Sequence, residues 1–180
     1  MTTMATRKHR DPAAPPLDEA LLDKALQRII DEPRSWDQAS WCGISDASLL
    51  PEIDSPLESV CGTTACLAGH LLLSSGRYGL SVVVDHYTDD DGAAITDKGV
   101  YFYLIADGLP DHDPGVYEEG AAMNLLGLTY SEAETLFGAS NTSTPQTFAA
   151  FVRRVLCLPP RVYVKTPERS VKGAHPQAVA

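Results

Sequence analysis

The sequence predicts a mainly helical α+β fold, with four to five helices around a buried central helix and one β-hairpin. Three observations lead to this prediction. Apolar residues recur at helical spacing between residues 17 and 30. An almost unbroken apolar run covers residues 65–73, and two β-branched stretches, residues 80–86 and 100–105, have the composition of strands. With 180 residues, 44% of them hydrophobic, the chain is long enough for one domain with a sizeable core.

The first helix is expected at residues 17–30, because Leu17, Leu21 and the apolar residues after them share one helical face. Pro33 follows and ends it. Residues 33–60 are expected to be irregular and held on the core by tryptophan side chains. These tryptophans are Trp36 and Trp41.

The central helix is expected from about Thr64 to Ser75, with Thr63 or Thr64 as its N-cap. Nearly every side chain from Ala65 to Leu73 is apolar, and a helix that is apolar on all sides is buried. Gly76 suits the C-terminal end of this helix, where a left-handed backbone is common.

The hairpin is expected to pair a strand at residues 80–86 with a strand at residues 100–105. A long acidic connection, which contains Asp89–Gly92 and Asp97–Gly99, would join the two strands. The expected hairpin therefore has short strands and a wide, solvated loop.

The last third of the chain predicts three helices. The first covers residues 116–126, and the second opens with a capping box formed by Thr129 and Glu132. The third begins at Pro145, which Thr144 precedes as the cap, and runs to about residue 157. The first two also have the outline of a helix-turn-helix, but the second of them carries two glutamates and no base, which argues against DNA reading.

The chain divides into three predicted parts: a flexible arm at residues 1–16, a single globular domain at residues 17–158 and a basic flexible tail at residues 159–180. The formal net charge is −10, but residues 35–152 hold 17 acidic residues against two bases, a net charge of −15. An acidic body argues against direct nucleic-acid binding and favours a basic protein partner or, more remotely, DNA mimicry. A solvated acidic surface without a partner is the plainer alternative.

The N-terminal residues have bases but no apolar stretch behind them, so no secretory signal is expected. No apolar run is long enough to span a bilayer. Four cysteines in a chain of this length do not make a disulfide framework. These features predict a cytoplasmic protein that does not bind membranes, and no motif predicts a cofactor.

Four side chains are candidate metal ligands: Cys42, Cys61, Cys66 and His70. Three thiolates and an imidazole form a ligand set that zinc accepts. The spacing argues against zinc, because no two of these cysteines stand two to four residues apart. The alternative is that Cys66 is a small buried residue and His70 a hydrogen-bonded core histidine.

A thiol enzyme is a second hypothesis, with Cys61 or Cys66 as nucleophile and His86 on the following strand as base. A thiol near a helix N-terminus has a lowered pKa, because exposed amides stabilise the thiolate. Cys61, just before the expected cap, is the better placed of the two.

The order Trp41, Cys-Gly-Thr-x-x-Cys-x-Ala-Gly at residues 61–69, Leu-Leu-Gly-Leu-Thr at residues 125–129 and Thr-Pro at residues 144–145 resembles a group of small uncharacterised proteins from actinobacteria and their phages. The resemblance covers residues 17–157 and implies no activity. In similar sequences tryptophan often stands at the position of His70, which implies that this histidine is not a required ligand.

Together these features predict an accessory or interaction protein, non-enzymatic, whose acidic face binds a basic partner. A cysteine-dependent enzyme and a small zinc-binding protein are the alternatives.

Overall fold

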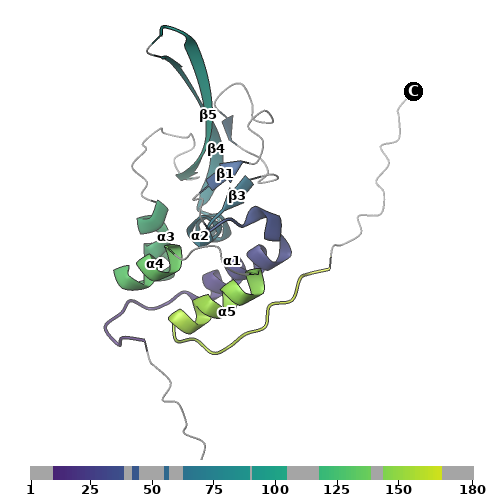
Figure 1. The fold of residues 1–180 in the computed structure, drawn as a ribbon. Helices are drawn as coiled ribbons and strands as arrows, with labels where there is room; N and C mark the ends of the chain where they lie inside the picture. Colours follow the sequence, from purple (N-terminus) through teal and green to yellow (C-terminus); the bar gives the residue numbers. More distant parts are fainter. Residues whose placement is uncertain are drawn as a thin grey trace, which may run out of the picture.

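The computed structural model of this chain describes residues 10–38, 42–44, 55–56, 63–89, 91–104, 118–138 and 144–167. In these ranges the chain forms five α-helices and five strands. The mainly helical α+β class, with a buried central helix and a β-hairpin, is confirmed. Figure 1 shows the helices gathered at one end of the molecule and the hairpin rising away from them.

Helix α1, Glu19–Asp31, confirms the first predicted helix. The Asp18 carboxylate caps it by accepting a hydrogen bond from the backbone N–H of Leu21. Five side chains of its apolar face are buried: Leu22, Ala25, Leu26, Ile29 and Ile30. A short 3₁₀ turn at Pro33–Ser35 follows, because proline cannot continue the α-helix.

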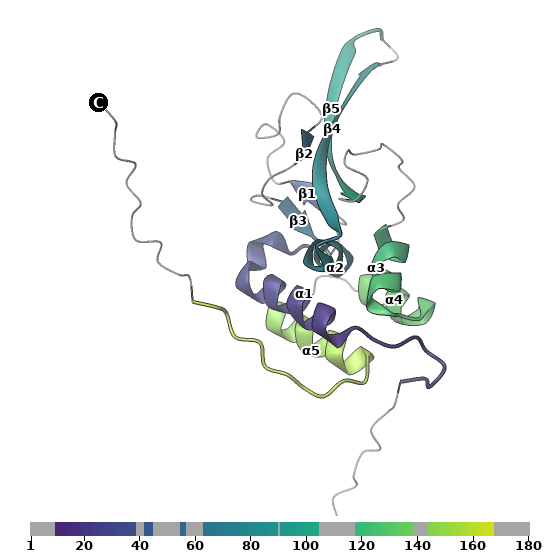
Figure 2. The same cartoon turned by 180° about the vertical axis from the view of Figure 1, so that it is seen from behind.

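Helix α2, Leu67–Ser75, is the central element of the core. It packs against α1 and α3, and Figure 2 shows it between these helices at the base of the strands. Leu67, Leu71 and Leu72 have no exposed surface, and each such burial stabilises the fold by about 1.5–3 kcal/mol. Gly76 ends the helix with φ +71°, as predicted.

The predicted start of this central helix is wrong. Thr63 and Thr64 do not cap a helix but belong to strand β3, Thr63–Ala65, which pairs antiparallel with β1, Cys42–Ile44. The N-cap is Cys66, which makes no capping hydrogen bond with its side chain. Threonine is β-branched and suits a strand, and a partner from the segment predicted as irregular pairs with its backbone.

The hairpin is longer and its connection shorter than predicted. Strands β4, Tyr78–Thr88, and β5, Ala94–Leu104, pair antiparallel over eleven residues each, and β2, Ser55–Pro56, pairs with β4 on its other edge. Asp97–Gly99 lies inside β5 rather than in a loop. The turn closes at Asp89, whose carboxylate accepts the N–H groups of Asp91 and Ala93.

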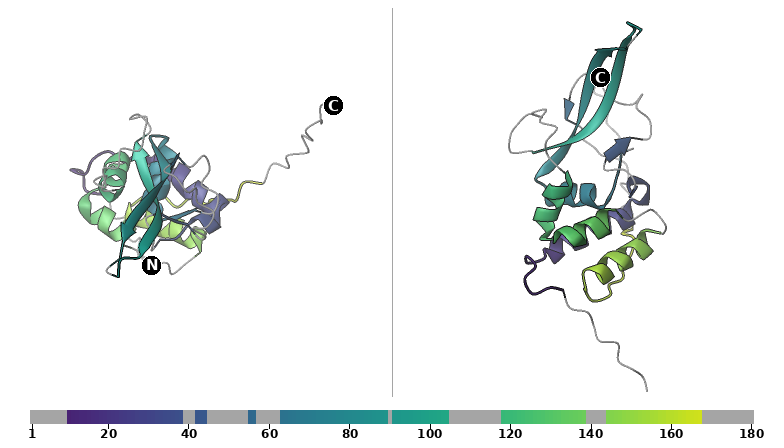
Figure 3. Two further views of the ribbon diagram at one scale, coloured as in Figure 1. Left: turned by 90° about the horizontal axis from the view of Figure 1, so that it is seen from above. Right: turned by 60° about the vertical axis from the view of Figure 1, so that its left-hand side comes forward.

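Three helices complete the domain: α3, Glu118–Leu126, α4, Tyr130–Phe137, and α5, Pro145–Val155. The capping box of Thr129 and Glu132 is present, and Thr144 caps α5, both as predicted. Apolar residues of the corner between α3 and α4 are buried, namely Leu126, Leu128, Ala133, Leu136 and Phe137. The right-hand view of Figure 3 shows the two helices side by side. The two helices form a corner held by apolar packing, which is the arrangement that the acidic residues of the second helix favour over a DNA-reading helix-turn-helix.

Residues of both predicted flexible ends lie against the helices. Tyr163 is buried, and Thr166 donates its backbone N–H to the Asp31 carboxylate of α1 at 2.7 Å. At the other end, Arg10 of the predicted arm bonds to both carboxylate oxygens of Glu132 in α4. Described residues of the predicted arm and of the predicted tail therefore contact the helices.

Candidate functional site

The start of α2 holds two of the predicted site residues, and both are in the core. Cys66 is 2% exposed and His70 is 1% exposed. The Cys66 carbonyl accepts the N–H of His70 in the first turn of the helix. This geometry places the Cys66 side chain in the interior of the domain.

His70 is a neutral, hydrogen-bonded core residue. Its Nε2 lies 3.0 Å from the carbonyl oxygen of Ser35, and because a carbonyl only accepts, Nε2 carries the hydrogen. Burial lowers the pKa of His70 to about 4, and the nearby Arg28 charge adds to this effect. Among the described residues, its buried Nδ1 has no hydrogen-bond partner, and neither has the Oγ of Ser74 one turn further along α2.

Gln38 supplies the cap that the threonines do not. Its buried side-chain oxygen accepts the N–H of Leu67, the first residue of α2, at 3.1 Å. Its Nε2 donates to the carbonyls of Leu136 (2.9 Å) and Phe137 (3.3 Å) at the end of α4. One glutamine therefore satisfies the start of α2 and the end of α4. The signal in the sequence is weak, since Gln38 stands 29 residues before the helix that it caps.

Trp36 holds the Gln38 segment in place. Its ring lies 4.8 Å from the Phe148 ring of α5, and its Nε1 donates to the Gln38 side-chain oxygen at 3.2 Å. The expectation that a tryptophan holds the irregular segment on the core is confirmed for Trp36. Trp41 lies outside the described residues.

The other candidate ligands are only partly placed. The β1–β3 register sets the Cα of Cys42 opposite Ala65, next to Cys66 in the chain, but the Cys42 side chain and all of Cys61 lie outside the described residues. Within the described part of the chain, no three His, Cys, Asp or Glu side chains form a group that could hold a metal ion. The zinc hypothesis stays a prediction.

His86 is not brought to Cys66. It lies near the far end of β4, is exposed, and its Nδ1 lies 3.0 Å from the Thr96 hydroxyl across the hairpin. Cys66 lies at the base, at the start of α2, and Figure 1 shows β4 running away from that helix. Cys66 and His86 therefore form no nucleophile–base pair in this structure.

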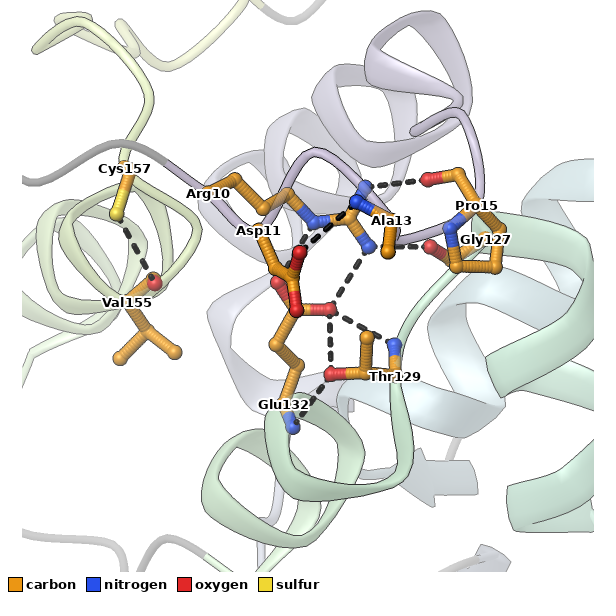
Figure 4. A network of polar contacts seen from close by, with 9 residues as sticks. All are labelled: Arg10, Asp11, Ala13, Pro15, Gly127, Thr129, Glu132, Val155 and Cys157. Carbon is orange, nitrogen blue, oxygen red and sulfur yellow. Dashed lines mark hydrogen bonds and ion pairs between the residues drawn. The ribbon is translucent and has the colours of Figure 1, made fainter.

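Arg10 ties the N-terminal segment to the α3–α4 corner, as Figure 4 shows. Its guanidinium bonds to both Glu132 carboxylate oxygens (2.6 and 2.8 Å) and to the carbonyls of Pro15 and Gly127. The hydrogen bond from Arg10 is the main cause that lowers the pKa of Glu132 to about 2. A β-carbon at Gly127, where φ is +75°, would collide with the Pro16 carbonyl oxygen.

Asp23 of α1 holds the C-terminal segment through a second network of charged and polar side chains, as Glu132 holds the N-terminal one. It accepts hydrogen bonds from Arg153, Arg161 and Tyr163. Burial, together with the bond to Asp23, raises the pKa of Tyr163 to about 12. Both networks are internal, because in each of them the charged side chains bind a neighbouring segment of the same chain.

The outer end of the hairpin belongs to the acidic region, and its residues His86–Thr88 and Asp91–Ala94 are exposed. Residues 78–96 contain four aspartates and no lysine or arginine. Tyr87 is 51% exposed, with Ile95 directly opposite it, and Asp91 is exposed in the turn. We call this end, residues 85–97, the hairpin arm.

Comparison of the chain with protein-family models, with curated proteins and with solved structures finds no match. No helix among the described residues is both long and apolar enough to cross a membrane. The fold and the contacts alone define the molecule: a mainly helical α+β domain that carries a projecting acidic hairpin.

Proposed function

We propose that this protein is a non-enzymatic binding protein and that its hairpin arm is the contact for a basic partner protein. The projecting hairpin carries the proposal: Figures 1 and 3 show its outer end extending beyond the helices. A two-stranded ribbon on its own is only marginally stable in water, so a protein that extends one gains from a partner that covers it.

The charge of the arm supports a basic partner. Residues 85–97 contain five aspartates and no lysine or arginine, and a segment with charges of one sign attracts opposite charge and speeds encounter. The burial of Cys66, and the position of His86 opposite Thr96 near the outer end of β4, favour a binding role over thiol catalysis by Cys66 and His86.

A charge reversal in the turn tests this function. Wild-type protein is titrated with a fluorescent deca-lysine peptide at about 50 and 300 mM salt, and binding is expected to weaken strongly at the higher salt. Asp91→Lys should weaken binding, whereas Glu134→Lys, the same change at an exposed site on α4, should have a smaller effect. Absence of binding at low salt, or equal effects of the two variants, would contradict the proposal.

A further inference from the structure

The two faces of the hairpin arm differ in chemistry. Tyr87 and Ile95 are Cα partners and share one face, while His86 and Thr96 are the next pair and share the other. The two side chains of the second pair bond to each other, with His86 Nδ1 3.0 Å from the Thr96 hydroxyl oxygen. The first pair presents an aromatic ring beside an aliphatic side chain, with the Tyr87 side chain half exposed.

We propose that the face formed by Tyr87 and Ile95 binds an arginine side chain in an extended segment of the partner. This inference rests on the proposed function and names the chemistry of its partner. The guanidinium stacks on the Tyr87 ring, its stem lies along Ile95, and the carboxylate of Asp91, which is exposed in the turn, supplies the opposite charge.

Arginine fits this face better than lysine does. The guanidinium is planar and weakly hydrated, so it stacks on an aromatic ring while it keeps its hydrogen bonds to carboxylates. Lysine carries a compact, strongly hydrated charge and gains less from the ring. Exposed tyrosine is also among the residues that dominate binding energy at interfaces.

A separate protein is favoured over a second copy of this chain. Several bases of the chain already bind its own acids: Arg10 binds Glu132, and Arg153 and Arg161 bind Asp23. Two copies of the arm would bring aspartates together, which is repulsive.

The test compares deca-arginine with deca-lysine by fluorescence anisotropy. Wild-type protein is expected to bind deca-arginine about two- to five-fold more tightly, the size of an exposed cation–π contact. Tyr87→Ala should abolish this preference and Tyr87→Phe should keep it. Tyr130→Ala removes a tyrosine that is 73% exposed on α4 and should leave the preference unchanged.

The outcomes separate this inference from the function on which it rests. The arginine site is overturned if wild type binds both peptides equally, or if Tyr87→Ala keeps the preference for deca-arginine. If binding is still salt-dependent in that case, the proposal that the acidic arm binds a basic partner remains. Absence of binding to either peptide overturns both. Sedimentation tests for self-association of the chain. If the chain self-associates, if Tyr87→Ala abolishes this association and if deca-arginine does not dissociate it, then the face binds a second copy of the chain and the arginine site is overturned.

Discussion

The side-chain oxygen of Gln38 accepts the backbone N–H of Leu67 at 3.1 Å, and this bond begins the central helix. Strand β3 ends immediately before the helix, and Cys66 at the N-cap offers no capping group of its own. The segment with two cysteines and a histidine is therefore a junction between strand and helix, closed by a glutamine from elsewhere in the chain.

Gln38→Ala is expected to lower the free energy of unfolding by about 1–3 kcal/mol, because it leaves the Leu67 N–H and the carbonyls of α4 buried without this partner. Urea denaturation measures the change. Gln146→Ala, at an exposed position of α5, is the matched control and should be within about 0.5 kcal/mol of wild type. Equal stability of the two variants would show that Gln38 is not the cap.

His70 makes stability depend on pH between its ordinary pKa of 6.5 and its folded value of about 4. The unfolded chain protonates this residue first, so stability contributed by neutral His70 is present above pH 6.5 and is lost as the pH falls toward 4. The loss is about 3 kcal/mol over this window. His70→Gln should flatten that part of the stability profile, whereas His86→Gln should not; parallel profiles for wild type and His70→Gln would refute the assignment.

Arg10 and Glu132 give a second window at lower pH. The folded pKa of Glu132 is about 2 against an ordinary 4.5, so the stability from the pair is present above pH 4.5 and is lost as the pH falls toward 2. Arg10→Met should destabilise the protein at pH 7, and the difference from wild type should shrink across that window. Arg34→Met, at an exposed arginine, is the control. A difference that does not change with pH would contradict the ion pair.

Cys66 is expected to resist alkylation in the folded protein. Its residue is 2% exposed, whereas Cys157 is half-buried after α5. Iodoacetamide labelling followed by peptide mass spectrometry should modify Cys66 at least about tenfold more slowly than Cys157, because Cys66 requires local opening. Rapid, selective labelling of Cys66 near neutral pH would contradict this prediction and would support the thiol-enzyme hypothesis.

The features that were predicted correctly are local in sequence. The capping box spans Thr129 to Glu132, and the amphipathic pattern of α1 lies within fourteen residues of chain, 17–30. Thr63 and Thr64 are good N-cap residues by the same kind of local rule. They nevertheless form a strand because they pair with β1, and no local sequence pattern indicates this pairing.

The other differences between the predicted and the observed structure also arise from contacts between residues that are far apart in the sequence. Gln38 acts across 29 residues, and Arg10 acts across 122 residues on Glu132. The C-terminal segment has a basic, polar composition that reads as a tail, but Asp23 and Asp31 of α1 hold it through Arg161 and Thr166. Single-residue partners at long separation leave no periodic pattern in a sequence.

The proposed binding site is the hairpin arm, residues 85–97, whereas the start of α2 has a structural role. Backbone amide NMR during titration with deca-arginine tests both parts at once. The predicted result is a set of shift changes confined to the arm, which are smaller in Asp91→Lys at the same peptide concentration. Shift changes centred on residues 63–70 at the start of α2, or none anywhere, would contradict it.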